Sequence, residues 1–121
     1  MARVLALTRD LLFGSQLHGS LSAAGHAVEL TGDEAALRDA LPADALLVDL
    51  TDAAPERCEL LEALARDGAL GVTRTLAYYS HVEADVRERA EGAGFEMIVP
   101  RSRMAREAPA VLASLLDGGA G

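Results

Sequence analysis

The chain has 121 residues, half of them hydrophobic and only 3% aromatic, so we expect one domain with a core of Leu, Val and Ala. Its formal net charge of −8 argues against binding to nucleic acid, because that binding depends on basic groups that neutralise phosphates. No stretch reaches the roughly 20 apolar residues of a membrane span, and no N-terminal signal pattern is present. We therefore expect no membrane contact and a cytoplasmic location.

Five short apolar segments predict strands, and the most pronounced of them is 45–50. An apolar run of this length bounded by turn residues is typical of a strand buried on both faces of a parallel sheet. The run carries one carboxylate, Asp49, which we expect at its C-terminal end because an ionised group is costly inside a buried strand. Open α/β sheets place their ligand crevices at that end. The five predicted strands are 3–8, 26–30, 45–50, 74–79 and 95–99.

Segments with helical spacing alternate with these strands. Asp33 is a typical N-cap for the second helix, and Pro42 closes it. Pro109 lies inside the last helix, so that helix is expected to start nearer residue 107 or to bend there. The predicted helices are 11–24, 34–41, 55–66, 83–93 and about 104–116.

This alternation predicts the fold class. Strands that alternate with helices through short linkers form βαβ units with right-handed crossovers and a parallel sheet. We therefore expect an α/β protein with a single doubly wound (βα)5 domain over residues 1–121 and helices on both faces of the sheet. Residues 117–121 are expected to form a flexible tail.

Two strand ends carry residues that resemble a known signalling module. In length, element order and spacing the chain resembles the CheY-like receiver domains of bacterial response regulators, which are flavodoxin-like modules of two-component signalling and phosphorelays. The resemblance implies a sheet in the order 2-1-3-4-5. It also implies that Asp49 stands at the phosphoacceptor position. Ser80 stands at the switch position, where a hydroxyl donates a hydrogen bond to a phosphoryl oxygen.

The metal-binding part of the family pattern is altered. Receivers carry an acidic pair after the first strand, which holds Mg²⁺ together with the phosphoacceptor. This chain has Thr8 and Arg9 there, with Asp10 one residue further on. A divalent cation needs carboxylate oxygens, and an arginine beside the site would compete with it. We therefore expect no Mg²⁺ cofactor and no metal site, with Asp10 and Asp49 as the remaining candidate ligands.

The cationic part of the pattern is altered as well. The family's Lys-Pro pair after the fifth strand corresponds to Pro100 and Arg101, and all eleven basic residues of the chain are arginine. A guanidinium is a planar fork and not a compact point charge. His81 replaces the small residue that follows the switch position, where it could overhang the pocket. The chain thus resembles a degenerate receiver.

An internal ion pair could replace the missing chemistry. We hypothesise that Asp49 lies close to Arg9 or Arg101, in a charge-assisted pair that mimics the metal-bound or phosphorylated state. In the alternative interpretation Asp49 is a solvated acid that caps the following turn. Ser80 and His81 are then ordinary turn and loop residues.

The resemblance predicts a function in protein contact and not in catalysis. We expect a stand-alone, atypical receiver-like module, not an enzyme, that binds a protein partner or forms a homodimer. The expected face consists of the helix 83–93, the strand 95–99 and the last helix. Its arginines would meet acids of residues 29–67, a segment with eleven acids and three arginines. Alternatively these arginines form local pairs, such as Glu83 with Arg87 and Asp85 with Arg89. The arginines of the face are Arg87, Arg89, Arg101, Arg103 and Arg106.

Two other functions remain open. The first is a flavodoxin-like protein that binds a small anion or nucleotide in the crevice at the strand ends. The second is a conventional phosphoacceptor at Asp49 that uses Asp10 and Asp52 for metal. The side chains expected to line an anion pocket are Thr8, Arg9, Ser80, His81, Arg101 and Ser102.

Overall fold

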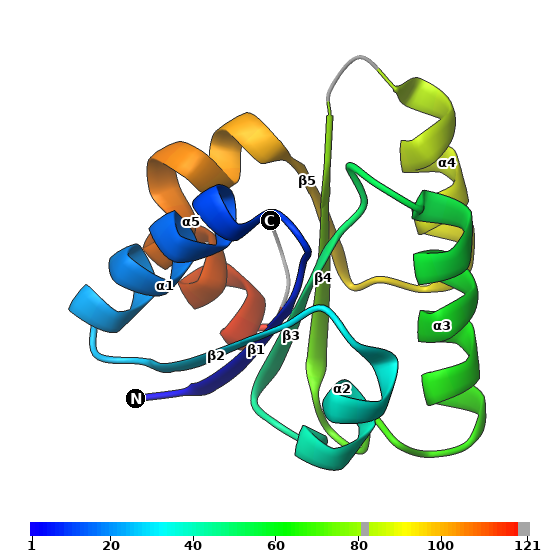
Figure 1. The fold of residues 1–121 in the computed structure, drawn as a ribbon, viewed down its shortest axis with the longest axis horizontal. Helices are drawn as coiled ribbons and strands as arrows, with labels where there is room; N and C mark the ends of the chain where they lie inside the picture. The colour runs from blue at the N-terminus through cyan, green and yellow to red at the C-terminus, as the bar shows by residue number, and fades with distance from the viewer. Residues whose placement is uncertain (81–82, 119–121) are drawn as a thin grey trace.

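The computed structural model describes residues 1–80 and 83–118 and contains a five-stranded parallel sheet between two layers of helices (Figure 1). The strand order is β2-β1-β3-β4-β5, so the predicted fold class and strand order are confirmed. The strands are β1 (Arg3–Leu7), β2 (Ala27–Thr31), β3 (Ala45–Asp49), β4 (Arg74–Tyr79) and β5 (Met97–Pro100).

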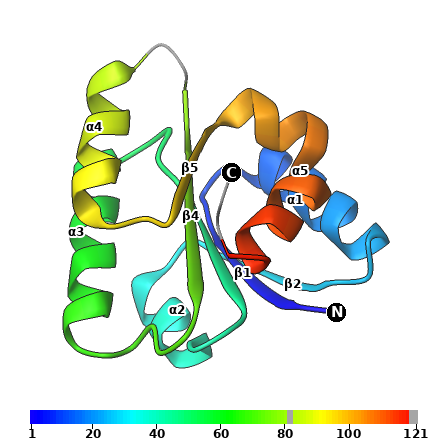
Figure 2. The same cartoon turned by 180° about the vertical axis from the view of Figure 1, so that it is seen from behind.

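The helices lie on both faces of the sheet. Figures 1 and 2 show α1 and α5 on one face and α2, α3 and α4 on the other. Within the described part of the chain, no helix is both long enough and apolar enough to cross a bilayer. The helices are α1 (Leu11–Ala23), α2 (Glu34–Ala40), α3 (Ala54–Arg66), α4 (Ala84–Ala93) and α5 (Arg101–Leu116).

The sheet separates the hydrophobic core into two clusters, one on each face, and the central strand β3 contributes to both. Successive side chains of a strand point to opposite faces of the sheet. Leu47 and Tyr78 accordingly pack under α1 and α5, whereas Leu46 and Tyr79 pack under α3 and α4. All five residues of β3 are buried, as its apolar run predicts.

The predicted boundaries hold within two residues except at the start of the last helix. The predicted strand 95–99 is found at Met97–Pro100, because Glu96 is held by Arg74 and by Thr75 before the regular pairing begins. The last helix starts at Arg101 and not at about Met104. No side chain caps its first turn, so the sequence carries no start signal there.

The bend predicted from Pro109 is confirmed. Glu107 has φ −144° and ψ 37°, which is not helical, and it divides α5 into two segments. Proline lacks an amide hydrogen and its ring clashes with the carbonyl four residues earlier, so the backbone must deviate in the preceding turn.

Candidate functional site

The ends of β1, β3 and β4 meet at one edge of the sheet and bring the predicted site residues together. Asp49 ends β3 and is only 5% exposed. Thr8 directly follows β1, and Ser80 directly follows β4. The next residue, His81, lies outside the described residues.

The Asp49 carboxylate is held by two threonines. Its Oδ2 accepts a hydrogen bond from Thr8 Oγ1 at 2.7 Å, and its Oδ1 accepts bonds from the Thr51 amide at 2.8 Å and from Thr51 Oγ1 at 2.5 Å. Thr8 Oγ1 in turn accepts a bond from the Asp10 amide at 3.0 Å. Asp49 therefore caps the turn that follows its strand, as the alternative interpretation predicts, but it is buried and not solvated.

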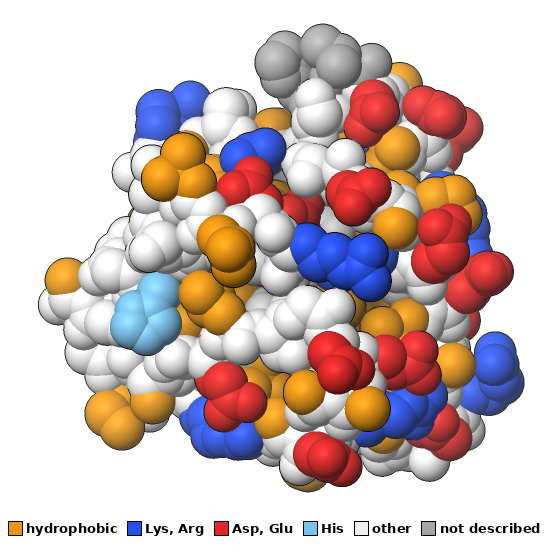
Figure 3. Space-filling view, in the orientation of Figure 1, with side chains coloured by type: hydrophobic (Ala, Val, Ile, Leu, Met, Phe, Trp, Pro, Cys, Tyr) orange, Lys and Arg blue, Asp and Glu red, His pale blue; other side chains and the backbone are white. Residues whose placement is uncertain are grey.

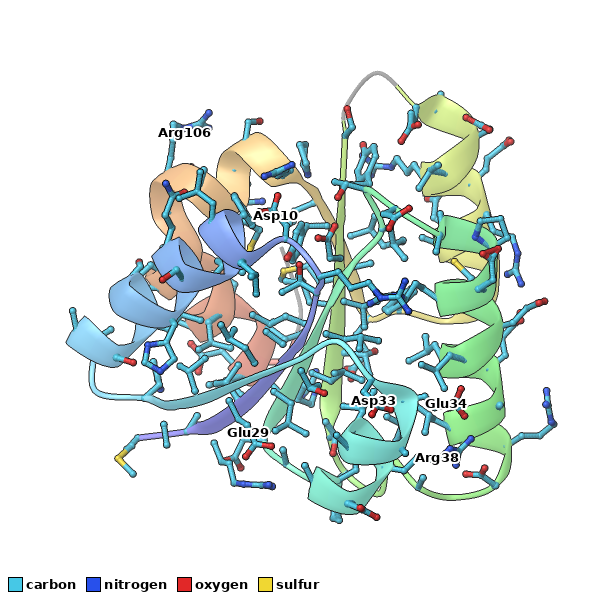
Figure 4. The ribbon with its side chains drawn as sticks, in the orientation of Figure 1. Asp10, Glu29, Asp33, Glu34, Arg38 and Arg106 are labelled. Atoms are coloured by element: carbon cyan, nitrogen blue, oxygen red, sulfur yellow. The ribbon has the colours of Figure 1, made fainter. Side chains whose placement is uncertain are left out.

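The Asp10 carboxylate interacts with both the start of α1 and the start of α5. Its Oδ1 accepts a hydrogen bond from the Phe13 amide at 2.9 Å, which caps α1, and its Oδ2 pairs with Arg101 Nη2 at 2.7 Å. The Arg101 guanidinium lies 4.3 Å from the centre of the Phe13 ring. The Phe13 amide and, secondarily, the Arg101 charge lower the pKa of Asp10. Figure 4 labels Asp10 between these two helix ends.

The ion pair hypothesised for Asp49 is not formed. Arg101 pairs with Asp10 instead, and Arg9 is exposed. Among residues 1–80 and 83–118, no salt bridge involves Asp49. The Arg101 guanidinium that the hypothesis assigns to Asp49 is instead taken by Asp10, the N-cap of α1, at 2.7 Å.

Arg57 is a site residue that our sequence analysis missed. It is 8% exposed, and its Nη1 donates a hydrogen bond to the Leu7 carbonyl at 3.2 Å. Burial, and then the nearby charge of Arg9, lower the pKa of Arg57. The sequence does contain a signal, because Arg57, Leu61 and Leu64 recur at the spacing of one helix face and Arg57 must therefore face the sheet.

Two hollows lie on either side of Thr51, which lines both of them. The first has about 220 Å³ and is lined by Arg9, Asp10, Asp49, Thr51, Asp52 and Arg57. The second has about 400 Å³ and is lined by Phe13, Gln16, Thr51, Ser80, Arg101, Ser102 and Ala105. Of the predicted pocket residues, Arg9 and Asp10 line the first hollow and Arg101 lines the second, whereas Thr8 and Pro100 line neither. Pro100 ends β5 and caps α5 through its extended backbone, which places Arg101 at the second hollow.

The backbone on both sides of Asp49 has local constraints, a left-handed residue at Ala53 and a close helix–strand approach at Gly14. Ala53, at the start of α3, has a left-handed conformation with φ 54°, which costs an L-residue roughly 1–2 kcal/mol. On the other side, a Cβ added at Gly14 would lie 3.2 Å from Thr8 Cγ2, so the absence of a side chain lets α1 approach the end of β1. These features fix the loops that carry Thr8 and Thr51.

The carboxylate oxygens of Asp49 and Asp10, the candidate ligands of the Mg²⁺ ion that the family resemblance implies, are engaged within the chain. Both oxygens of Asp49 accept hydrogen bonds from threonine, and both oxygens of Asp10 are engaged by Phe13 and Arg101. Arg9 and Arg57 line the same hollow and already supply positive charge. In the described part of the chain, no group of three or more His, Cys, Asp or Glu side chains is arranged to hold a metal.

Similar solved structures are receiver domains. The receiver domain of the TMAO respiratory system response regulator TorR matches with a TM-score of 0.82 at 17% identity, over 96% of this chain and 97% of that one. The receiver domain of the putative response regulator NarL from Mycobacterium tuberculosis matches with a TM-score of 0.76 at 22% identity, over 97% of each chain. Comparison with protein-family models and with curated protein sequences gave no match.

The chain therefore has the fold of a response-regulator receiver domain, as the resemblance predicted. It also matches the Salmonella typhimurium response regulator RcsB with a TM-score of 0.78 at 18% identity, over 96% of this chain but only 60% of the RcsB chain. The fold is thus one that also occurs as part of a longer regulator.

The interactions of Asp10 predict a pH dependence of stability. Because folding lowers the pKa of Asp10 below its ordinary 3.8, the ionised carboxylate stabilises the fold above that value, and this contribution is lost as the pH falls through the folded-state pKa. Urea unfolding between about pH 5 and pH 2 should show a smaller loss of stability in Asp10→Asn than in wild type. Arg101→Met should retain part of the wild-type loss, because the Phe13 amide still lowers the pKa of Asp10 when the Arg101 charge is absent. Arg106→Met, whose pairing with Glu107 is long at 3.6 Å, serves as the control.

Proposed function

We propose that this protein is a receiver-like signalling module that acts by protein–protein contact and without Mg²⁺-dependent phosphorylation of Asp49. One observation carries the proposal: both Asp49 oxygens are engaged by Thr8 and Thr51, and Asp10, an acid of the same hollow, is paired with Arg101. A phosphoacceptor needs a free carboxylate oxygen and a cation beside it. The proposal assigns no catalytic role to the module.

For partner contact we propose the α4-β5-α5 face that the resemblance indicates. Three of its five arginines are engaged within the chain: Arg89 pairs with Glu62 at 2.8 Å, Arg87 donates to the Tyr79 hydroxyl at 3.3 Å, and Arg101 pairs with Asp10. The local pairs Glu83–Arg87 and Asp85–Arg89 are therefore not the contacts formed. Arg103 and Arg106 are the cations that we propose this face offers to an acidic partner. Arg106 has only a long pairing of 3.6 Å with its neighbour Glu107, and Figure 4 places it on the outer side of α5.

The test of the proposal is titration with Mg²⁺ and beryllofluoride, which together imitate an aspartyl phosphate. We expect the amide resonances of the β1, β3 and β4 ends to be the same with and without the reagent. Asp39→Asn is the control for non-specific effects of the ions, since Asp39 is an exposed acid of α2 that does not line this hollow. Saturable binding by wild type and Asp39→Asn, but not by Asp49→Asn, would instead establish a conventional phosphoacceptor.

The second hollow favours one alternative, the binding of a small anion. Arg101 and the hydroxyl-bearing residues Thr51, Ser80 and Ser102 line a space of about 400 Å³, a size that suits a small ligand. Titration with inorganic phosphate and with AMP distinguishes this function from the first. Binding that is lost in Arg101→Met but retained in Arg106→Met would support an anion site, and unchanged spectra would exclude these two ligands.

A further inference from the structure

The surface helix α1 carries no charged side chain, which is unusual for this chain. From Leu11 to Val28 the sequence contains no Asp, Glu, Lys or Arg, whereas a quarter of the whole chain is charged. Most residues of α1 are nevertheless exposed, and His18 is the only titratable side chain among them. Depletion of charge, and not hydrophobicity alone, is what distinguishes the centre of a protein interface from ordinary surface.

Two large apolar side chains stand at the start of this helix. Leu11 is 83% exposed and Leu12 is 74% exposed, whereas nearly all other leucines of the described chain are buried or half-buried. The 400 Å³ hollow continues into a smaller space between α1 and α5, because both are lined by Phe13, Gln16 and Ala105. Neither leucine lines this groove, but Leu12 lies one helical turn before Gln16, which does.

The neighbouring helix α5 adds mostly small side chains beside α1. Its exposed residues from Ser102 to Ala113 are small except for Arg106, although the half-buried Arg101, Arg103 and Glu107 also belong to this helix. Figure 3 shows few acidic side chains over α1 and α5, and most acids in that view lie over α2, α3 and α4. We name this surface the α1–α5 face and define it by its exposed residues Leu11, Leu12, Gln16, Ser20, Ser102 and Ala105.

We infer that the α1–α5 face is the contact surface of a symmetric dimer of this chain. Each copy carries a net charge of −8, so two copies repel each other wherever their acidic surfaces meet. A symmetric contact places the same surface of both copies together and therefore requires a surface compatible with itself. The α1–α5 face is compatible with itself in this sense, because α1 has no carboxylate that would repel its copy. Its exposed Leu11 and Leu12 supply apolar surface for the contact. This inference concerns a different surface from the α4-β5-α5 face and does not depend on the chemistry of Asp49.

Sedimentation velocity of the whole chain over a concentration series tests the inference. We expect a reversible monomer–dimer equilibrium that Leu12→Asp weakens at least about tenfold, because the change places one new carboxylate on each side of the contact. Val72→Asp is the matched control: Val72 is 88% exposed and precedes β4, at the opposite edge of the sheet from Leu12. Gln16→Glu, an exposed change on the same face, provides a second variant should Leu12→Asp not fold.

Salt distinguishes this dimer from a contact between arginines and acids. Screening reduces the repulsion between two copies of charge −8, so added NaCl should leave the dimer unchanged or strengthen it. Dissociation by salt would overturn the inference in favour of the charged α4-β5-α5 face. A wild-type chain that stays monomeric, or equal effects of Leu12→Asp and Val72→Asp, would also overturn it. None of these results bears on beryllofluoride binding, so the two proposals fail independently.

Discussion

Replacing Asp49 with alanine is expected to lower the free energy of unfolding by about 3 kcal/mol, the order expected for loss of hydrogen bonds to a buried charged group. The carboxylate accepts three hydrogen bonds while only 5% exposed. Its removal leaves the Thr8 hydroxyl and the Thr51 amide without their acceptor. Asp49→Asn should cost less, because the amide oxygen still accepts on one side. Urea unfolding at neutral pH measures both differences.

Asp52→Ala is the matched control for this experiment. Asp52 lines the same hollow as Asp49 but is exposed, so its removal should change the free energy of unfolding by less than about 0.5 kcal/mol. If Asp49→Ala instead stabilised the protein, the cost of burying the carboxylate would outweigh its hydrogen bonds. Asp49 would then be retained for function at the expense of stability, and the case for a structural role would be lost.

The second large effect is expected to be a gain in stability from Tyr78→Phe, of about 1 kcal/mol. Tyr78 is completely buried, and its hydroxyl has no hydrogen-bond partner among the described residues. Burial and the nearby Asp49 charge raise the pKa of this hydroxyl, so it is neutral at physiological pH. Phenylalanine keeps the contact with Phe13, whose ring centre lies 5.2 Å away, and removes the buried polar atom.

Tyr79→Phe provides a control of the opposite sign on the neighbouring residue. The Tyr79 hydroxyl accepts a hydrogen bond from Arg87, so its removal should leave stability unchanged or lower it slightly. Thermal unfolding of both variants gives the comparison. A loss of stability in Tyr78→Phe as large as in Asp49→Asn would mean that the Tyr78 hydroxyl belongs to the Asp49 hydrogen-bond network, contrary to our interpretation.

The sequence by itself determined the architecture and the position of Asp49. Apolar segments bounded by Gly, Pro and cap residues are local signals, and the cap at Asp33 and the bend near Pro109 were predicted from such signals and confirmed. The position of Asp49 at a strand end follows from the cost of burying a charge within β3. Each of these features depends on residues close together in the chain.

Only the tertiary structure decided which groups meet at the site. Arg101 pairs with Asp10 across 91 residues, and Arg57 reaches the Leu7 carbonyl across 50. Several acids and arginines lie near the strand ends, so their pairing depends on how closely α1, α3 and α5 approach the sheet. That approach is set by side-chain packing over the whole core, and no local pattern in the sequence encodes it.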